Sequence, residues 1–408
     1  MLRFCLVTTF YPPYHFGGDA IFVHRLARAL AERGHGVDVV HSVDAYRLSR
    51  SEPQPGFEET PGVRRLPLIS RSAHIAALVS HQVGAPGPYA RQLREILAPG
   101  RYDVIHFHNV SLVGGPGVLR YGDGIKLYTA HEYWLVCPTH VLFRFDGKAC
   151  FEKSCLRCTL QHKRPPQLWR STGLVKDCLR SIDRLLLQSR FAIERHRAEG
   201  IDAPIGLMPG FVPVPAAEPR PISGEPYFLF VGRLEKLKGL QDLFAMMCEF
   251  PAARLRIAGA GTYEQELRTM AAALPNVEFL GQVHPSRVAD LYRGALAVLV
   301  PSLCFEVFPL AVAEAMAFGT PVIARRIGAI TELVEDSGGG LLFDTPAQCR
   351  AQMERLLTMS TLRNELGRRG RAMALEHWTE EAHLRRYLAL IGELRKVRAT
   401  RDSGQQAG

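Results

Sequence analysis

Two glutamates lie close together where a buried strand gives way to a helix. Glu306 lies in the loop after the strand predicted at residues 297–300, and Glu314 lies in the helix that Pro309 and Leu310 begin. Proline fits the first turn of a helix because its missing N–H would have no partner there. Ligands of open α/β sheets bind beyond the carboxyl ends of the strands, and a helix N-terminus favours an anion. This stretch is therefore the first candidate binding site.

Four cysteines within a short segment, residues 137–166, could hold a metal ion. Cys137, Cys150, Cys155 and Cys158 follow the spacing C-x12-C-x4-C-x2-C, and the final CxxC fits one edge of a zinc tetrahedron. The segment has few long apolar runs, so it cannot bury enough surface to order itself unaided. We expect a structural zinc ion bound by all four thiolates. Thiols without metal, a redox-labile disulfide or an iron–sulfur cluster are the alternatives.

The elements around these residues predict two doubly wound α/β domains. In the first, a strand at residues 3–9 is followed by Gly17 and Gly18 and then by a helix at residues 20–33. Two adjacent glycines let the backbone approach a phosphate closely. His131 follows the strand predicted at residues 126–130, so it falls at the carboxyl edge of the same sheet.

A proline-rich stretch separates the two domains. Residues 204–226 carry seven prolines and little periodicity, which is typical of a linker. We expect the following parts: a first domain over residues 1–204 with the cysteine-rich insertion at 137–166, a linker at 205–226, a second domain at 227–376, a helix at 377–397 that crosses back to the first domain, and a disordered tail at 398–408.

Several motifs together resemble the retaining glycosyltransferases of family 4, also called group 1. They are Glu306-x7-Glu314 with EAMAFGTPVIA and the GxxxE segment at residues 328–332, an N-terminal PPxxxGGxxxxVxxLAxxL, DVIHFHN, TAHE, and GRL…KG after the strand at residues 227–231. Phe308-Pro309 stands where the family usually has Phe-Gly. The resemblance covers roughly residues 1–395. It implies the GT-B architecture, with two Rossmann-like doubly wound domains facing across a cleft, the donor on the second and the acceptor on the first.

The resemblance also assigns roles to individual residues. Arg233 and Lys238 neutralise the donor diphosphate, whose negative charge grows as it leaves. Glu306 and His131 hold the donor sugar, and Glu314 holds the ribose. The other substrate-binding residues are Gly17, Gly18, Val283, His284, Pro309 and Leu310. No two aspartates are two residues apart, so the Asp-x-Asp metal motif of the other common glycosyltransferase architecture is missing from the sequence, and we expect no catalytic cofactor.

Composition sets further limits on the function. The 408 residues suit two domains, and no apolar run reaches the 18 residues that a membrane helix needs. The N-terminus lacks a signal peptide, so we expect a cytoplasmic protein, peripheral at the inner face of the membrane. The net charge of +10 favours anionic partners. Residues 64–101 hold six arginines and one glutamate, a solvated basic face or a surface for the acceptor or an anionic membrane. No nucleic-acid-binding motif accompanies the charge.

The sequence therefore predicts a glycosyltransferase that moves a sugar, with retention, from a nucleoside diphosphate sugar to a saccharide or lipid-linked acceptor. Assembly of cell-envelope polysaccharide or glycolipid is the expected use, by analogy. Two other classes stay open. A nucleotide-sugar 2-epimerase of the same architecture would need more acid–base groups around the sugar, and a donor-binding protein without catalysis would need none.

Overall fold

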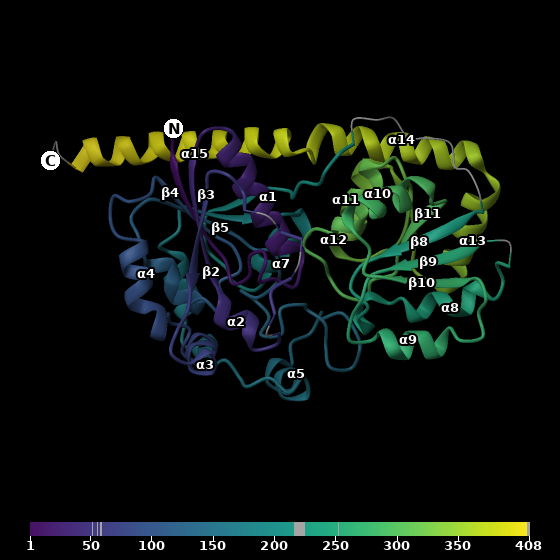
Figure 1. Cartoon of the computed structure of the whole chain (residues 1–408), viewed down its shortest axis with the longest axis horizontal. Helices are drawn as coiled ribbons and strands as arrows, with labels where there is room; N and C mark the ends of the chain where they lie inside the picture. The colour runs from purple at the N-terminus through teal and green to yellow at the C-terminus, as the bar shows by residue number, and fades with distance from the viewer. Residues whose placement is uncertain (51, 55, 58, 216–224, 252, 406–408) are drawn as a thin grey trace. The chain divides into compact units, whose positions relative to one another are not determined.

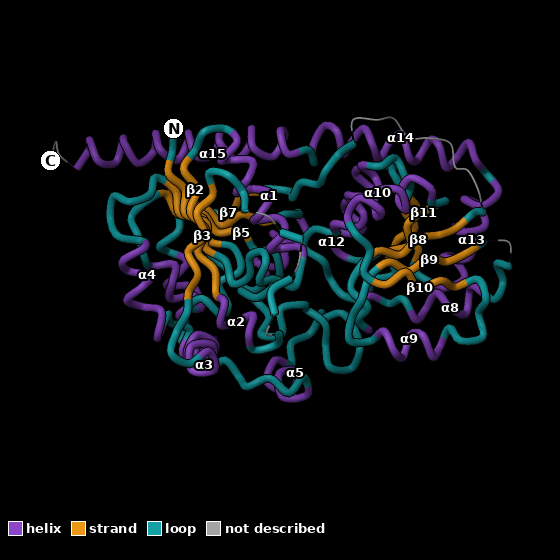
Figure 2. The backbone as a smooth tube through the Cα atoms, in the orientation of Figure 1, coloured by secondary structure: helices purple, strands orange, loops and turns teal. Residues whose placement is uncertain are grey.

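The computed structural model describes residues 1–408 except 51, 55, 58, 216–224, 252 and 406–408 (Figure 1). The chain divides into two compact units. The first unit consists of Met1–His140, Ser154–Met208 and Leu384–Gly408, and the second of Val141–Lys153 and Pro209–His383. Each unit contains one parallel sheet with helices packed on it, shown by the strands and helices of Figure 2.

The first sheet has seven parallel strands in the order β3-β2-β1-β4-β5-β6-β7. Their bounds are β1 (Arg3–Val7), β2 (Gly36–Ser42), β3 (Val63–Leu68), β4 (Val104–Phe107), β5 (Ile125–Thr129), β6 (Arg184–Leu187) and β7 (Ile205–Leu207). Strands β4 and β5 are buried along their whole length. Central strands of a parallel sheet are covered on both faces, which explains why even His106 and Lys126 are buried there.

The second sheet has six strands in the order β10-β9-β8-β11-β12-β13, and its pairs are parallel. Their bounds are β8 (Tyr227–Val231), β9 (Arg254–Ala258), β10 (Val277–Gly281), β11 (Ala297–Val300), β12 (Val322–Arg325) and β13 (Gly340–Phe343). In both sheets the first strand of the unit lies inside the sheet, and the chain adds strands on one side and then on the other. This is the doubly wound arrangement that the sequence predicted.

Helices connect the strands of each unit. Those of the first unit are α1 (Gly18–Glu32), α2 (Val43–Arg47), α3 (Ala73–Val83), α4 (Ala90–Ile96), α5 (Cys155–Gln161), α6 (Leu174–Leu179) and α7 (Arg190–Ala198), with short 3₁₀ turns at η1 (Gly87–Tyr89), η2 (Gly115–Arg120) and η3 (Leu168–Ser171). Those of the second are η4 (Lys236–Lys238), α8 (Gln241–Met247), α9 (Glu264–Met270), α10 (Pro285–Gly294), α11 (Leu310–Ala317), α12 (Gly328–Ser337), α13 (Pro346–Thr358) and α14 (Ser360–His377).

The C-terminal segment is more ordered than the sequence predicted. The last helix, α15 (Glu380–Gln405), extends beyond residue 397, where a disordered tail was expected. Arg398 gives the reason, since its guanidinium donates to the Asp183 carboxylate at 2.7 Å and to the carbonyl oxygens of Asp123 and Gly124 at 2.7 and 3.0 Å. The final three residues of the predicted tail lie outside the described residues.

The predicted linker and insertion also differ in detail. Residues 205–207 form β7 of the first sheet, and the next residues bond to the second unit, where the Val212 N–H donates to the Trp378 carbonyl at 2.9 Å. Residues 216–224 of the linker lie outside the described residues. Within the insertion, Val141–Lys153 belongs to the second unit, where the Phe151 and Phe305 rings meet at 5.1 Å. Hydrophobicity along the sequence does not reveal which unit such a segment packs with.

Candidate functional site

An ion pair lies at the carboxyl edge of the second sheet. Lys238 ends the short turn η4 after β8, and Glu306 lies in the loop after β11. The Lys238 ammonium is 3.0 Å from Oε1 of Glu306, and the Ser302 hydroxyl donates to the same oxygen at 2.6 Å. Both charged side chains are about one-fifth exposed. The structure thus brings together two of the residues that the sequence singled out separately.

Glycine at position 239 permits this approach of two loops. Its φ of 72° lies in the left-handed region, and a Cβ added there would lie 2.1 Å from the Pro301 carbonyl oxygen. The Leu303 N–H donates to the Leu237 carbonyl at 2.8 Å, so the loops are also joined through their backbones. This close packing explains why a glycine follows the lysine in the sequence motif. Gly239 allows the loop of Lys238 to approach the loop of Glu306.

The pair is charged at neutral pH. Burial by itself would raise the pKa of Glu306, but the charge of Lys238 and the hydrogen bonds from Ser302 and Lys238 outweigh burial and lower it. Burial by itself would lower the pKa of Lys238, and the attraction of Glu306 outweighs it and raises the pKa. The two shifts agree in sign with an ionised pair.

Arg233 lies on the same edge but has a separate partner. Its guanidinium donates to Glu235 at 2.8 Å, and its side chain is 56% exposed. The turn after β9 packs closely on this loop, since a Cβ on Gly259 would lie 1.9 Å from the Gly232 carbonyl oxygen and one on Gly261 would lie 2.2 Å from that of Leu234. Arg233 is therefore a solvent-accessible cation on a backbone fixed by glycine packing.

Glu314 lies in α11 and is oriented by a tyrosine that sequence reasoning missed. The Tyr292 hydroxyl of α10 donates to Oε2 of Glu314 at 3.0 Å, and the Tyr292 ring stacks on Phe318 at 5.4 Å. Burial, followed by the charge of Glu314, raises the pKa of Tyr292 well above its usual value, so the hydroxyl remains a donor. A tyrosine in a helix on its own carries no sequence signal for this role.

The remaining predicted residues of the second unit lie at helix beginnings. Pro309 is the N-cap of α11 rather than its first residue, and its carbonyl accepts from the Val312 N–H at 3.0 Å. Leu310 begins the helix. Val283 and His284 lie between β10 and α10, where the His284 carbonyl accepts from the N–H groups of Arg287 and Val288. All four are at the carboxyl edge of the second sheet, as expected.

Three histidines form a row at the carboxyl edge of the first sheet. The His131 Nε2 is 2.9 Å from Nδ1 of His108, and the rings stack at 5.2 Å. His106 instead bonds the Thr129 hydroxyl at 2.8 Å and the Tyr387 hydroxyl of α15 at 2.9 Å. His106 thus joins the sheet to α15, and His108 holds the ring of His131. Their alternation along β4 and the loop after it was visible in the sequence, but this partnership was not.

Gly17 and Gly18 lie at the start of α1, close to two acidic groups. Gly17 is the extended N-cap and Gly18 the first helical residue. Asp19 follows, and burial, then the charge of Glu132, raises the pKa of its carboxyl group. Glu132 itself bonds His140 at 2.8 Å. Asp19 was missed, because one acidic residue in a first helical turn is common on any helix.

The structure does not assemble the predicted zinc site. In the described chain no three His, Cys, Asp or Glu side chains lie close enough to hold a metal ion, and none of the nine cysteines forms a disulfide. Cys150 lies in the part of the insertion that packs with the second unit, whereas Cys137, Cys155 and Cys158 belong to the first. The four cysteines that were predicted to bind one ion thus belong to two different units. Zinc binding stays a prediction from the sequence.

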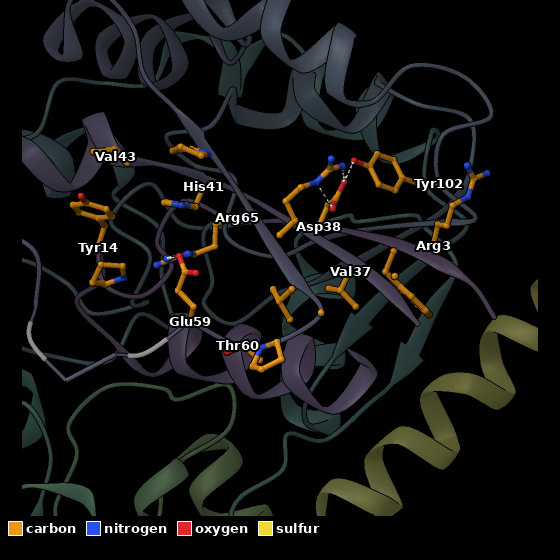
Figure 3. Close-up of a pocket in the computed structure, with 18 of the residues that line it drawn as sticks. Arg3, Tyr14, Val37, Asp38, His41, Val43, Glu59, Thr60, Arg65 and Tyr102 are labelled. Carbon is orange, nitrogen blue, oxygen red and sulfur yellow. Dashed lines mark hydrogen bonds and ion pairs between the residues drawn. The ribbon is translucent and has the colours of Figure 1, made fainter. Parts of the chain in front are cut away.

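A broad basic groove follows the β2 and β3 edge of the first sheet (Figure 3). It encloses about 1320 Å³, and its lining includes five arginines and two acidic residues, Asp38 and Glu59. Arg64 donates to Asp38 at 2.9 Å and Arg65 to Glu59 at 2.5 Å. None of the predicted site residues lines this groove, so it is distinct from the edge where Gly17 and His131 lie.

Two family models match the chain, one over its first half and the other over most of its second half. The model described as Glycosyltransferase Family 4 matches residues 16–214, and that described as Glycosyl transferases group 1 matches residues 216–373. A D-inositol 3-phosphate glycosyltransferase from Acidothermus cellulolyticus is 30% identical, over 96% of this chain and 90% of that protein. Sucrose-phosphate synthase from Thermosynechococcus elongatus superimposes with a TM-score of 0.76 at 20% identity, covering 97% and 100% of the two chains. HepE of Anabaena, solved with UDP and glucose, gives 0.69 at 16% identity, covering 96% and 100%.

The two sheets and these matches define a glycosyltransferase of the GT-B fold. The motifs identified in the sequence are therefore those of a known glycosyltransferase family. The chain belongs to the group 1, family 4 glycosyltransferases. The fold, the family and the class of enzyme predicted from the sequence are confirmed, while the roles of individual residues stay predictions. Membership in this family favours sugar transfer over the epimerase and the donor-binding protein.

Proposed function

We propose that the protein transfers a sugar from a nucleoside diphosphate sugar to a hydroxyl group of a saccharide or lipid-linked acceptor, with retention at the anomeric carbon. The observation that carries this proposal is the Lys238–Glu306 pair at the carboxyl edge of the second sheet, 3.0 Å apart. It combines a cation suited to a phosphate with a carboxylate suited to sugar hydroxyls. The solved relative with UDP and glucose supports a donor of this kind.

The donor diphosphate is the natural partner of the two cations. Lys238 and Arg233 are each paired with a carboxylate, Glu306 and Glu235 respectively. A bound diphosphate shares or takes over these cations, and its charge increases when the sugar leaves. Cations already in place stabilise that charge without rearrangement, which is how a transition state is favoured over the ground state.

The two glutamates then recognise the two sugars of the donor. Glu314, oriented by Tyr292, offers carboxylate oxygens to the ribose hydroxyls. Glu306 offers its carboxylate to the sugar that is transferred, and the family motif that contains His131 assigns this histidine to the same sugar. We assign the orientation of His131 to its bond with His108.

The transfer needs no protein nucleophile. The bond between the anomeric carbon and the phosphate oxygen breaks, and a bond from the acceptor oxygen to that carbon forms on the same face. The acceptor hydroxyl gives its proton to the leaving diphosphate, so the charge balance closes within the two substrates. The role of the protein is to position the substrates and to stabilise the developing charge.

The acceptor belongs to cell-envelope polysaccharide or glycolipid assembly in this proposal, at an anionic membrane surface. The net charge of +10 supports an anionic surface, and the relative from Acidothermus cellulolyticus is named for a phosphorylated polyol. No helix of the described chain is long and apolar enough to cross a membrane. We propose peripheral contact with a bilayer.

Incubation with a panel of labelled UDP- and GDP-sugars tests the reaction. Transfer predicts release of free nucleotide that accelerates when acceptor lipids or saccharides are added, and a product with the anomeric configuration of the donor. An inverted product would contradict retention. Conversion of the donor sugar into its 2-epimer without release of nucleotide would show the epimerase instead, and tight donor binding with neither reaction would show a binding protein.

A further inference from the structure

We propose that one surface of the first unit, built from α3 with the loop before it, α5 and the segment after α5, docks on an anionic lipid bilayer. This inference rests on the proposed function, because it names the membrane surface at which that reaction takes place. The α3–α5 surface is defined by six exposed apolar side chains: Ile69, Ile75, Leu78, Leu156, Leu160 and Leu168. Each of them is between 55% and 69% exposed.

Exposed apolar side chains are concentrated here. Of the fifteen large hydrophobic residues that are exposed in the described chain, seven lie within residues 69–83 and 155–168, the seventh being Val83. Single exposed leucines are normal on soluble proteins, whereas a group of them on neighbouring elements marks an interaction site.

Both helices bury small residues and expose large ones. Helix α3 turns Ala76, Ala77 and Ser80 inward and leaves Ile75 and Leu78 exposed. A helix that needed only to pack on its neighbours α2, η1, η2 and η3 would use its large apolar side chains for burial, because burial of apolar area is what stabilises the packing. The outward isoleucine and leucine therefore point to a second apolar environment.

Helix α5 repeats this arrangement on a shorter element. It buries Cys158 and Thr159 and exposes Leu156 and Leu160, which are one helical turn apart. Residues i and i+4 share a face of a helix, so the two leucines form one apolar strip. Arg157 is exposed beside them.

The segment after α5 connects this helix to α3. The Trp169 indole of η3 donates to the His81 carbonyl of α3 at 2.7 Å. The Arg164 N–H donates to the Thr159 carbonyl at 3.0 Å, so Arg164 lies beside the end of α5. Figure 2 shows α3 and α5 on the same side of the first unit.

The charge of these segments indicates which kind of partner binds the α3–α5 surface. Residues 154–176 of the first unit contain five basic residues and no acidic one. Four of them are exposed (Arg157, Lys163, Arg164 and Lys176), whereas Arg170 donates to the carbonyl oxygens of Trp134 and Leu135. Of the five arginines in residues 60–94, Arg71 and Arg94 are exposed, whereas Arg64, Arg65 and Arg91 form ion pairs with Asp38, Glu59 and Glu95. Apolar side chains among cations suit the boundary of a bilayer, where acyl chains receive the former and anionic headgroups attract the latter.

Sedimentation of the full chain with vesicles tests the docking surface. Wild type should bind phosphatidylcholine vesicles that contain about 30% phosphatidylglycerol much more tightly than pure phosphatidylcholine, and added salt should weaken binding. The double variants Ile75→Ser/Leu78→Ser and Leu156→Ser/Leu160→Ser should each weaken binding roughly tenfold or more. Lys163→Glu/Arg164→Glu should remove the preference for anionic vesicles.

A matched control replaces two similarly exposed apolar side chains with serine outside the α3–α5 surface. Met270→Ser/Leu375→Ser replaces two side chains on α9 and α14 that are 50% and 48% exposed, and vesicle binding should not change. All the substituted side chains are exposed, so circular dichroism should show intact folding. If the surface variants bind vesicles as wild type does, or the control loses as much binding as they do, the proposal is wrong.

The nature of the partner is tested with the same proteins. If wild type instead self-associates as its concentration rises, and the serine variants abolish this without any binding of vesicles, the surface is an interface between copies and the lipid proposal fails. Failure of the proposed function gives a different result. Vesicle binding that depends on these residues, without sugar transfer from any donor, would contradict the enzyme reaction and leave the docking surface standing.

Discussion

At the scale of single residues, the cations beside the donor site lead to the first prediction. Arg233→Ala or Lys238→Ala should lower turnover about 10²–10³-fold, since each removes a charge that stabilises the leaving diphosphate. Steady-state kinetics with the identified donor measures this. Arg268→Ala is the matched control, because Arg268 forms an exposed ion pair with Glu264 of α9 in the same unit. Retention of more than about half the activity by both variants would refute the diphosphate assignment.

The second prediction concerns the pH dependence of the Lys238–Glu306 pair. The pKa of Glu306 is lowered, so its share of stability is present above its ordinary value of 4.5 and is lost as the pH falls through the lowered value. The pKa of Lys238 is raised, so its share is complete below its ordinary value of 10.5 and is lost as the pH rises through the raised one. The pair therefore stabilises the protein throughout the neutral range.

Thermal unfolding at several pH values measures this contribution. Glu306→Gln should melt below wild type at pH 7, and the gap should narrow as the pH falls below 4.5, where wild type loses the same charge. A gap of constant size down to the acid limit would show that the stability effect does not come from the ionised carboxylate.

The third prediction separates the two glutamates. Glu314→Gln should weaken binding of the nucleoside diphosphate itself, because we assign this carboxylate to the ribose. Tyr292→Phe should weaken binding less, because it removes only the hydrogen bond that orients the carboxylate. Glu306→Gln should leave this binding nearly unchanged and reduce transfer, because we assign Glu306 to the transferred sugar. Calorimetry with UDP and with GDP decides the matter, and equal losses of affinity for Glu306→Gln and Glu314→Gln would exclude this division.

At the scale of elements, the cysteine-rich insertion carries the fourth prediction. Four thiolates would complete a structural zinc site, which orders a segment with little apolar surface. Elemental analysis of protein purified without a metal-affinity tag should give about one zinc per chain. Cys155→Ser/Cys158→Ser should abolish zinc and expose residues between 140 and 165 to protease. Protein that is metal-free and fully active, with four titratable thiols here, would refute the site.

The sequence predicts these elements well where the local pattern decides and poorly where distant packing decides. The strand before Glu306, the helix after Pro309 and the glycine at 239 all follow from composition within a few residues. The partnership of Tyr292 with Glu314, or of His108 with His131, depends on how elements far apart in the sequence meet. The same holds for residues 141–153, whose attachment to the second unit is decided by contacts such as that between Phe151 and Phe305.

At the scale of the whole molecule, the sequence predicted two parallel sheets, because alternating strands and helices allow few topologies. The family was predicted separately, from the resemblance of its motifs. It also placed the candidate residues on the correct edges, since carboxyl ends of parallel strands share one edge. The end of α15 was mispredicted because the polar, charged residues near position 398 resemble a tail in sequence. Their order comes from Arg398 and its bonds to Asp183 and to the backbone before β5.

Helix α15 contributes buried residues to both units, and this affects the thermal unfolding of the protein. Ala382 and His383 of α15 are buried in the second unit, and the helix continues without interruption to Leu384 and Tyr387, which are buried in the first. Unfolding of either unit withdraws support from a helix that the other needs, so the fifth prediction is a single cooperative transition. Scanning calorimetry should give equal calorimetric and van't Hoff enthalpies for wild type. Arg385→Pro, which interrupts the helix beside this junction, should split the transition into two, whereas two separate transitions in wild type would show that the units melt independently.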